Sequence, residues 1–425
     1  MATYEKKGIA VEIDSSVSNV WGPGSTVKAV VKVDIPRMLR DGIEEVYAEL
    51  VGLVKCGFVE SGRFTGPVAS YQETQTFLNL KTNVCKVQDT ASPAKEIGTL
   101  PAISSFPISF VIPEHRTLPP SFSYSDYHIA GQVQYFIKVV AIKSAWYKPN
   151  VEIRTPFKFL PWESSEPGTV SLAQQRSFRK ESRMRRNAIF RDEAKVEAEI
   201  YLPDVEALPA FQPIPFSIRI RCVSKPLPQA SSSSPSTFTF PIPPLSSDRI
   251  QFELQEHISV QSRGDRRSST KKYPHLGGFG VQSSDDQMHP VIRSEIGDPI
   301  WEQSDKSAEG RWSQTVLYHS SFRLNGWPPS FSTAMLGVQY TFELGVPFPG
   351  LGNDLKMKVE GLAISSGLFR PSTSGAAAFE LPPCAALYQL LIRSALSHRY
   401  NFYFSTYWEA VAPTTDNSLM EDSKS

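Results

Sequence analysis

Hydrophobic and polar residues alternate with a period of two along much of this chain, and that pattern limits the fold more than any other feature. The alternation is clearest in five segments, at 27–33, 133–139, 216–222, 250–254 and 338–344. Successive side chains of a β-strand point to opposite faces, so this pattern is typical of antiparallel strands with one buried face. The 34 prolines further disfavour long helices, because proline lacks the backbone donor that a helix needs. The sequence therefore predicts an all-β protein of sandwich architecture.

A repeated sequence block indicates two similar sandwiches in tandem. The first copy has Pro-Pro-Ser-Phe at 119–122 and Val-Gln-Tyr at 133–135, and the second has the same blocks at 328–331 and 338–340. The two spacers differ by four residues, which a loop can absorb. Adjacent prolines predict a stiff, extended entry into a strand. The alternative is that the proline pair is a ligand for a proline-recognising module.

Changes in composition suggest how the chain is divided. The polar, basic stretch at 161–190 predicts a hinge. The Ser/Pro-rich stretch at 224–247 and the charged stretch at 261–290 predict loops, and the polar end of the chain predicts a disordered tail. The best helical pattern is at 384–398. The predicted organisation is an N-terminal sandwich at 1–160, a basic hinge at 161–190, a C-terminal sandwich at 191–410 with loop insertions at 224–247 and 261–290, and a tail at 411–425.

Three blocks carry a resemblance to a known family. An aromatic–Pro-Gly turn and strand lie at 20–33, a strand ending in a Gly-containing turn lies at 43–56, and a Phe-rich strand, Leu-Pro-Pro-Ser-Phe turn and further strand lie at 105–139. Their order resembles the arrestin family, and its α-arrestin branch more than the visual type. The resemblance covers about residues 8–160 and continues as a pattern over 190–410. It implies two tandem immunoglobulin-like antiparallel β-sandwich domains joined by a short hinge.

The resemblance also implies a function. Arrestin-like proteins are cytosolic adaptors that bind cytosolic tails of membrane proteins, often transporters, and link them to endocytosis, sorting or ubiquitination. Many α-arrestins recruit a ubiquitin ligase through Pro-Pro-x-Tyr motifs, which this sequence lacks, so a ligase would need a bridging partner. The alternatives are a retromer-type coat subunit in endosomal transport and a lectin-like carbohydrate-binding sandwich. We expect a cytoplasmic protein, peripheral at the plasma membrane or endosome.

The strongest local candidate for binding is a cluster of basic residues in the predicted hinge. Six of the eleven residues at 176–186 are basic and one is acidic. Such a cluster could attract anionic lipid headgroups, or bind acidic and phosphorylated client tails through bidentate arginine contacts. The alternative is a solvated linker with no binding role. The candidate anion- and client-binding residues are Arg176, Arg179, Lys180, Arg183, Arg185 and Arg186.

Two serines are candidate phosphorylation sites. Ser268 and Ser269 follow a pair of arginines in a stretch predicted to be a loop, which is a pattern favoured by basophilic kinases. Phosphate would change the local charge by about −1.5 to −2.

Other function classes find little support in the sequence. Lys and Arg total 44 against 43 Asp and Glu, which argues against a nucleic-acid-binding protein. The four cysteines form no C-x-x-C pair, and the seven histidines show no metal-ligand spacing. Nucleophile-elbow, P-loop, zincin and dinucleotide-binding motifs are absent. We therefore expect no enzymatic activity, cofactor or metal. No run of about 18 apolar residues predicts a transmembrane helix, and the N-terminal residues lack the apolar core of a signal peptide.

Overall fold

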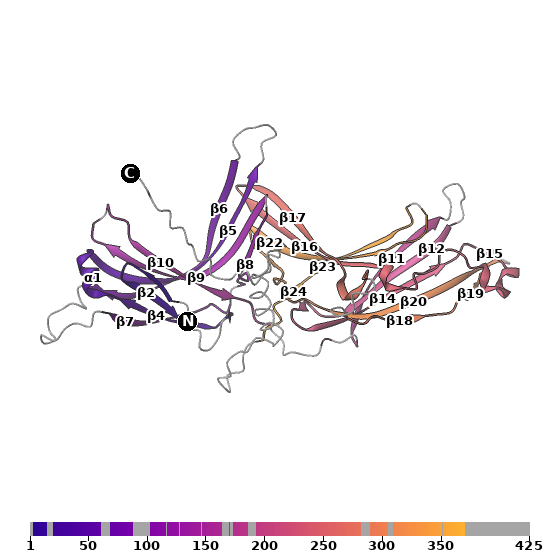
Figure 1. The fold of residues 1–425 in the computed structure, drawn as a ribbon, viewed down its shortest axis with the longest axis horizontal. Coiled ribbons are helices and arrows are strands. Elements are labelled where there is room, and N and C mark those ends of the chain that lie inside the picture. The colour runs from indigo at the N-terminus through magenta and orange to yellow at the C-terminus, as the bar shows by residue number, and fades with distance from the viewer. Residues whose placement is uncertain are drawn as a thin grey trace, which may run out of the picture.

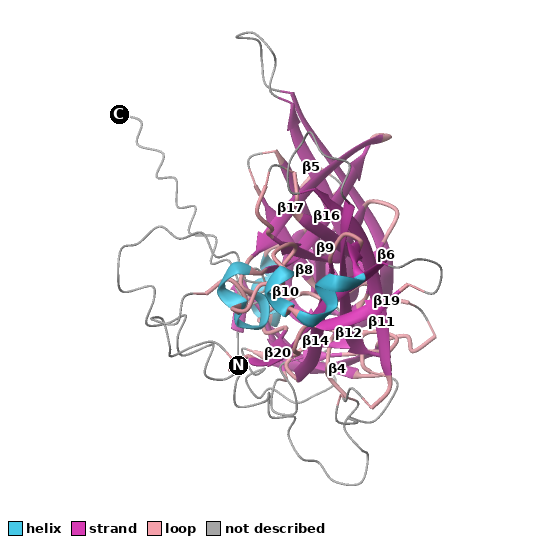
Figure 2. Ribbon diagram, turned by 90° about the vertical axis from the view of Figure 1, so that its right-hand side faces the viewer, coloured by secondary structure: helices cyan, strands magenta, loops and turns pink. Residues whose placement is uncertain are grey.

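The computed structural model describes residues 3–14, 20–60, 69–87, 103–115, 117–126, 128–145, 147–163, 170, 173–185, 193–281, 290–304, 309–350 and 352–369. Its regular structure is nearly all β-strand, in several mainly antiparallel sheets, which confirms the predicted all-β class. Figure 2 shows strands through the whole body and helical turns only as short segments. We call residues 3–163 the N-half and residues 173–369 the C-half. Within the described residues, no helix has the length and apolar character needed to cross a membrane.

The N-half contains two sheets (Figure 1). The first sheet consists, in spatial order, of β1 (Thr3–Lys6), β2 (Ile9–Ile13), β4 (Thr26–Val33) and β7 (Ser104–Val111). The second consists of β3 (Val20–Trp21), β10 (Val151–Phe159), β9 (Ile129–Lys143), β5 (Ile43–Glu60) and β6 (Ala69–Lys86), with β8 (Phe122–Ser125) pairing with β9. A short helix, α1 (Ile35–Arg40), follows β4. Asp34 caps this helix by accepting a hydrogen bond from the N–H of Arg37 at 3.0 Å.

The C-half also contains two large sheets. The first has the order β11 (Gln175–Arg185), β12 (Glu193–Pro203), β14 (Pro213–Val223), β20 (Glu309–Arg323) and β15 (Leu227–Pro228), with β18 (Arg293–Ile296) and β19 (Ile300–Gln303) also pairing with β20. The second has β17 (Asp265–Tyr273), β16 (Gln251–Ser262), β22 (Leu336–Val346) and β21 (Phe331–Ser332), with β23 (Leu355–Leu362) also pairing with β22. The short strands β13 (Leu208–Pro209) and β24 (Ile364–Ser365) form a separate parallel pair.

The strand order of the N-half recurs in the C-half. In the first sheets, β1-β2-β4-β7 corresponds to β11-β12-β14-β20, and in the second sheets β10-β9-β5-β6 corresponds to β23-β22-β16-β17. The short strands β8 and β21 are also equivalent, since Phe122 pairs with Val133 and Phe331 pairs with Val338. The repeated sequence block therefore marks a repeated topology.

The tyrosine of each repeated block is tied to the first proline of the same block. The hydroxyl of Tyr135 donates a hydrogen bond to the Pro119 carbonyl at 2.6 Å. The hydroxyl of Tyr340 donates to the Pro328 carbonyl at 2.7 Å. Both rings are buried, so each hydroxyl needs such a partner.

The serine of each block hydrogen-bonds to the backbone of a later strand, β10 in the N-half and β24 in the C-half. Ser121 donates its N–H to the Phe159 carbonyl, and its hydroxyl accepts the N–H of Phe159 at 2.9 Å. Ser330 makes the same two bonds with Ile364, where the hydroxyl distance is also 2.9 Å. These contacts support the structural interpretation of the block.

Burial follows the predicted alternation. In β4, Val27, Ala29, Val31 and Val33 are at most 2% exposed, while the residues between them face outward. Most buried apolar side chains of both halves belong to one continuous cluster, and Val51, Leu53 and Phe136 form a second, small one.

Two predicted loop regions contain strands instead. The hinge prediction for 161–190 is wrong over 175–185, because these residues form β11 and pair with β12 along their whole length. The insertion predicted at 261–290 is wrong over 265–273, which form β17 and pair with β16. A strand rich in basic residues has the composition of a polar linker, and the sequence alone does not show which strand it pairs with. The predicted loop at 224–247 holds only β15 and short 3-10 turns. The predicted helix at 384–398 and the tail at 411–425 lie outside the described residues.

Candidate functional site

The predicted basic cluster forms the edge of a sheet. β11 pairs with β12 from Gln175, opposite Pro203, to Arg185, opposite Glu193. Within the described ranges no strand pairs with the other edge of β11. Met184 is 1% exposed and anchors one face of the strand in the core. The cluster is therefore held on a rigid element rather than on a linker.

The strand divides the predicted residues between two faces, because side chains alternate. Arg179, Arg183 and Arg185 lie on the outer face, and Arg176 and Lys180 on the other. Arg176 is half-buried, donates to the Val205 carbonyl at 3.3 Å and lies over the Phe178 ring at 5.4 Å. Arg186 lies outside the described residues. The sequence cluster is thus not a single basic patch.

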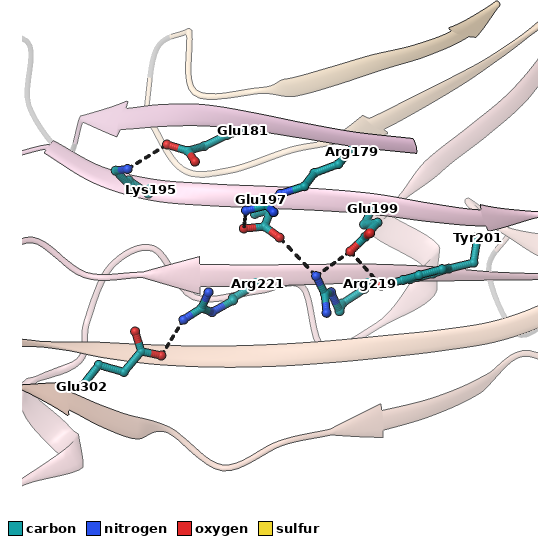
Figure 3. A network of polar contacts seen from close by, with 9 residues as sticks. All are labelled: Arg179, Glu181, Lys195, Glu197, Glu199, Tyr201, Arg219, Arg221 and Glu302. Atoms are coloured by element: carbon teal, nitrogen blue, oxygen red, sulfur yellow. Dashed lines mark hydrogen bonds and ion pairs between the residues drawn. The ribbon is translucent and has the colours of Figure 1, made fainter. Parts of the chain in front are cut away.

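Ion pairs cross the outer face of the same sheet (Figure 3). Arg179 contacts Glu197 at 2.6 Å, and Arg219 contacts both Glu197, at 3.2 Å, and Glu199. The Tyr201 hydroxyl donates to Glu199 at 2.7 Å. Glu197 and Glu199 are each only 8% exposed, so these carboxylates need their partners. The guanidinium of Arg179 is therefore already engaged in joining β11 to β12.

Further pairs neutralise other charges on this face. Lys195 contacts Glu181 at 2.8 Å, and its hydrogen bond and charge lower the pKa of this carboxylate. Arg221 contacts Glu302 at 2.5 Å. Burial alone would raise the pKa of Glu302, but hydrogen bonds from Ser313 and Arg221 together outweigh it and the net shift is downward. The other exposed basic residues of β11, besides Arg179, are Lys180, Arg183 and Arg185.

The side chain of Asn353 shows how the outer edge of β11 can be bound. Its Oδ1 accepts the N–H of Arg185 at 3.1 Å, and its Nδ2 donates to the Arg185 carbonyl at 2.8 Å. An added strand would make the same pair of bonds. Because the backbone direction alternates, the N–H and carbonyl groups of Arg183, Glu181 and Arg179 also point away from β12.

One of the two predicted phosphorylation sites, Ser269, lies at the contact between the halves. Ser269 is half-buried, and its hydroxyl lies 2.8 Å from the Tyr124 hydroxyl of the N-half. Tyr124 in turn donates to Asp126 at 2.7 Å. Burial is the main cause that raises the pKa of Tyr124 to about 12. Ser268 is exposed on the opposite face of β17, so the two serines have different surroundings.

A buried carboxylate lies in the same region. Glu256 is 4% exposed and accepts a hydrogen bond from Tyr273 at 3.0 Å. Burial raises the pKa of Glu256, and the Tyr273 hydrogen bond and the charge of Lys271 only partly offset this. The ammonium of Lys271 also lies over the Tyr124 ring at 4.8 Å. Lys271 therefore places a positive charge near both Glu256 of the C-half and the Tyr124 ring of the N-half.

Sequence reasoning missed several residues of these sites. Glu197 and Glu199 occupy the polar positions of an alternating segment, so their outer-face position had a sequence signal. Nothing in the sequence connects Asn353 with Arg185, or Tyr124 with Ser269, because each pair is separated by more than 140 residues.

The described residues include a groove but no metal-ligand cluster. They contain no cluster of three His, Cys, Asp or Glu side chains that could hold a metal ion. A groove of about 550 Å³ lies beside His257, Gln339 and Glu360. Both ring nitrogens of His257 already hydrogen-bond with Thr270 and Thr341. The chain matches no family model and no curated protein.

Proposed function

We propose that this chain is a non-catalytic, arrestin-like trafficking adaptor. In this proposal, two tandem immunoglobulin-like sandwiches, joined by a short hinge between β10 and β11, bind cytosolic segments of membrane proteins for endocytosis, sorting or ubiquitination. The recurrence of one strand order in both halves supports the tandem arrangement. The resemblance of 20–33, 43–56 and 105–139 to arrestins supports the adaptor role, and a ubiquitin ligase would be recruited through a bridging partner.

The observation that carries the binding mode is the open edge of β11. Asn353 already uses the Arg185 position of this edge, and the positions before it have no strand partner among the described residues. An extended client segment could add to this edge through main-chain hydrogen bonds. Lys180 and Arg183 would favour an acidic or phosphorylated segment and repel a basic one.

The proposal is tested by fluorescence anisotropy of the full chain with a fluorescent peptide of repeated Val-Glu-Glu, whose glutamates lie on both faces of an added strand and can therefore meet Lys180 on one face and Arg183 on the other. Replacing Lys180 and Arg183 by glutamine should weaken binding about tenfold, since two charge contacts are lost. Arg221→Gln is the control, because it removes one charge from an inner strand of the same sheet. A loss of about threefold in this control, which is the share of one charge in a tenfold loss for two, would mean that overall charge, not the edge of β11, binds the peptide.

A second substitution separates strand addition from charge attraction. Glu181→Pro removes an edge-facing N–H and one negative charge, and proline is tolerated at such a position of an edge strand. Strand addition predicts weaker peptide binding by this variant, whereas charge attraction alone predicts tighter binding. An unchanged melting temperature would establish that the sheet is intact.

A retromer-type coat subunit is the second candidate function. It is favoured by the continuous apolar core that joins the two halves, since a rigid body suits a permanent scaffold. Size-exclusion of the tagged chain in lysate, followed by crosslinking and mass spectrometry, distinguishes the two. A stable large complex with sorting-coat subunits favours the scaffold, and recovery of transporters with a ligase favours the adaptor.

A further inference from the structure

Three segments meet at the end of the N-half that lies farthest from the C-half. They are the β1–β2 turn at 6–8, helix α1 with the residues after it at 35–42, and the described residues of the β9–β10 turn at 143–145 and 147–150. The N–H of Asp34 donates to the Gly8 carbonyl at 2.9 Å, and the N–H of Ser144 donates to the Gly42 carbonyl at 3.0 Å. We call these three segments together the α1 tip. Figure 1 places α1 at the left-hand end of the molecule, far from β11.

The α1 tip is rich in basic side chains. Its three segments contain one acidic residue, Asp41, and six basic residues. Further carboxylates flank the segments at Glu5, Asp34, Glu44, Glu45 and Glu152, of which Glu152 pairs with Arg154 at 2.5 Å. The Asp34 carboxylate is engaged in capping α1. The six basic residues are Lys6, Lys7, Arg37, Arg40, Lys143 and Lys148.

Two large apolar side chains are exposed among these charges. Leu39 on α1 is 43% exposed, and Tyr147 in the β9–β10 turn is 69% exposed. The ammonium of Lys148 lies 5.9 Å from the centre of the Tyr147 ring. An exposed aliphatic residue and a tyrosine beside lysine and arginine match the interface of a bilayer, where apolar groups enter the headgroup region and cations meet anionic lipids. A free phosphate or an acidic peptide would bind the charges but would leave Leu39 and Tyr147 in water.

We infer that the α1 tip binds the surface of an anionic lipid bilayer. Lys6, Arg40 and Lys148 supply attraction to the headgroups, and Leu39 and Tyr147 insert between them. This inference stands apart from the peptide-binding proposal, because β11 lies on the other half of the molecule. It also differs from the membrane role considered for the basic cluster at 176–186.

Co-sedimentation of the full chain with lipid vesicles tests the inference. One set of vesicles is phosphatidylcholine alone, and the other contains about 30% phosphatidylserine. The unmodified chain should pellet with the anionic set, and less so as salt is raised. Replacing Arg40 and Lys148 by glutamine should weaken binding about 25-fold, at about fivefold for each basic residue. The matched control replaces Lys180 and Arg183 on β11 by glutamine and should bind as the parent does.

A second pair of substitutions tests insertion. Replacing Leu39 and Tyr147 by serine leaves the charge unchanged and should weaken vesicle binding at least about threefold, including at high salt. All four positions are exposed, so circular dichroism and melting temperature should match the parent. The inference is overturned if the parent does not pellet with anionic vesicles, if it pellets equally with both sets, or if only the β11 variant loses binding.

Discussion

The rings of Phe122 and Phe331 meet edge to face, with their centroids 5.4 Å apart. These two residues occupy the same position in the two copies of the repeated block, so the halves of the molecule touch through equivalent side chains. Gly131 of the N-half and Leu336 of the C-half, which also occupy equivalent positions, lie against each other as well. A Cβ added to Gly131 would lie 2.6 Å from Leu336, and each of these residues stands two positions before the Val-Gln-Tyr of its block. The two halves are therefore joined through equivalent surfaces, one from each half.

The phenylalanine contact can be measured as a coupling energy. We expect Phe122→Ala to lower the free energy of unfolding by about 3–5 kcal/mol, because the side chain is 4% exposed. Phe331 is half-buried, so Phe331→Ala should cost less. The double variant should reveal a coupling of about 0.5–1.5 kcal/mol in urea denaturation. Strict additivity would mean that the two rings do not stabilise each other.

The two tyrosine hydrogen bonds should contribute equally to the free energy of unfolding. Tyr135→Phe and Tyr340→Phe each leave a proline carbonyl without its donor and should each lower stability by about 1–3 kcal/mol. Tyr47→Phe is the control, since this hydroxyl makes no hydrogen bond within the described part of the chain. A loss confined to one half would contradict the equivalence of the two blocks.

The two candidate phosphorylation sites should respond differently to negative charge. Ser269→Glu replaces a hydroxyl that contacts Tyr124 and adds a carboxylate near Asp126, so we expect a loss of about 1–3 kcal/mol. Ser268→Glu, on the exposed face of the same strand, should change stability by less than about 0.5 kcal/mol. Thermal denaturation of both variants checks this. An equal loss of stability in the two variants would contradict the different surroundings of Ser268 and Ser269.

The buried carboxylate of Glu256 should make stability depend on pH. Its pKa in the folded chain is raised by burial above the ordinary value of 4.5, so the folded state holds the proton more tightly than the unfolded state. The contribution of Glu256 to the free energy of unfolding is therefore most favourable at low pH. It decreases as the pH rises from 4.5 through the raised pKa. Glu256→Gln should be more stable than the parent at neutral pH, with the difference vanishing below about pH 4. A constant difference from pH 4 to pH 8 would contradict this assignment.

Arg219 should stabilise the sheet more than Arg221 does. Arg219→Gln leaves the buried carboxylates of Glu197 and Glu199 with one partner fewer and should cost about 1–3 kcal/mol. Arg221 pairs with the exposed Glu302, so Arg221→Gln should cost less than about 1 kcal/mol. Urea denaturation of the two variants provides the comparison, and the reverse order would rule out the buried network as the source of stability.

The sequence by itself determined the strand class and the internal duplication. Alternation at 27–33 and 338–344 follows from the geometry of a strand with one buried face, which is a local property. The Pro-Pro-Ser-Phe and Val-Gln-Tyr blocks identified equivalent strands, because in each half the same residues make the same contacts, such as the hydrogen bond from the tyrosine to the first proline. The assignment of 161–190 to a hinge failed over β11, because a charged edge strand and a polar linker have similar compositions.

Only the tertiary structure decided what the candidate residues contact. The basic cluster at 176–186 is a single run in the sequence, but pairing with β12 sends alternate side chains to opposite faces and commits Arg179 to Glu197. Ser268 and Ser269 are adjacent in the chain, yet only Ser269 meets Tyr124 of the other half. Likewise, the α1 tip assembles charges from three distant segments. These contacts join residues far apart in the sequence, so they depend on sheet register and on how the halves pack, which local patterns do not encode.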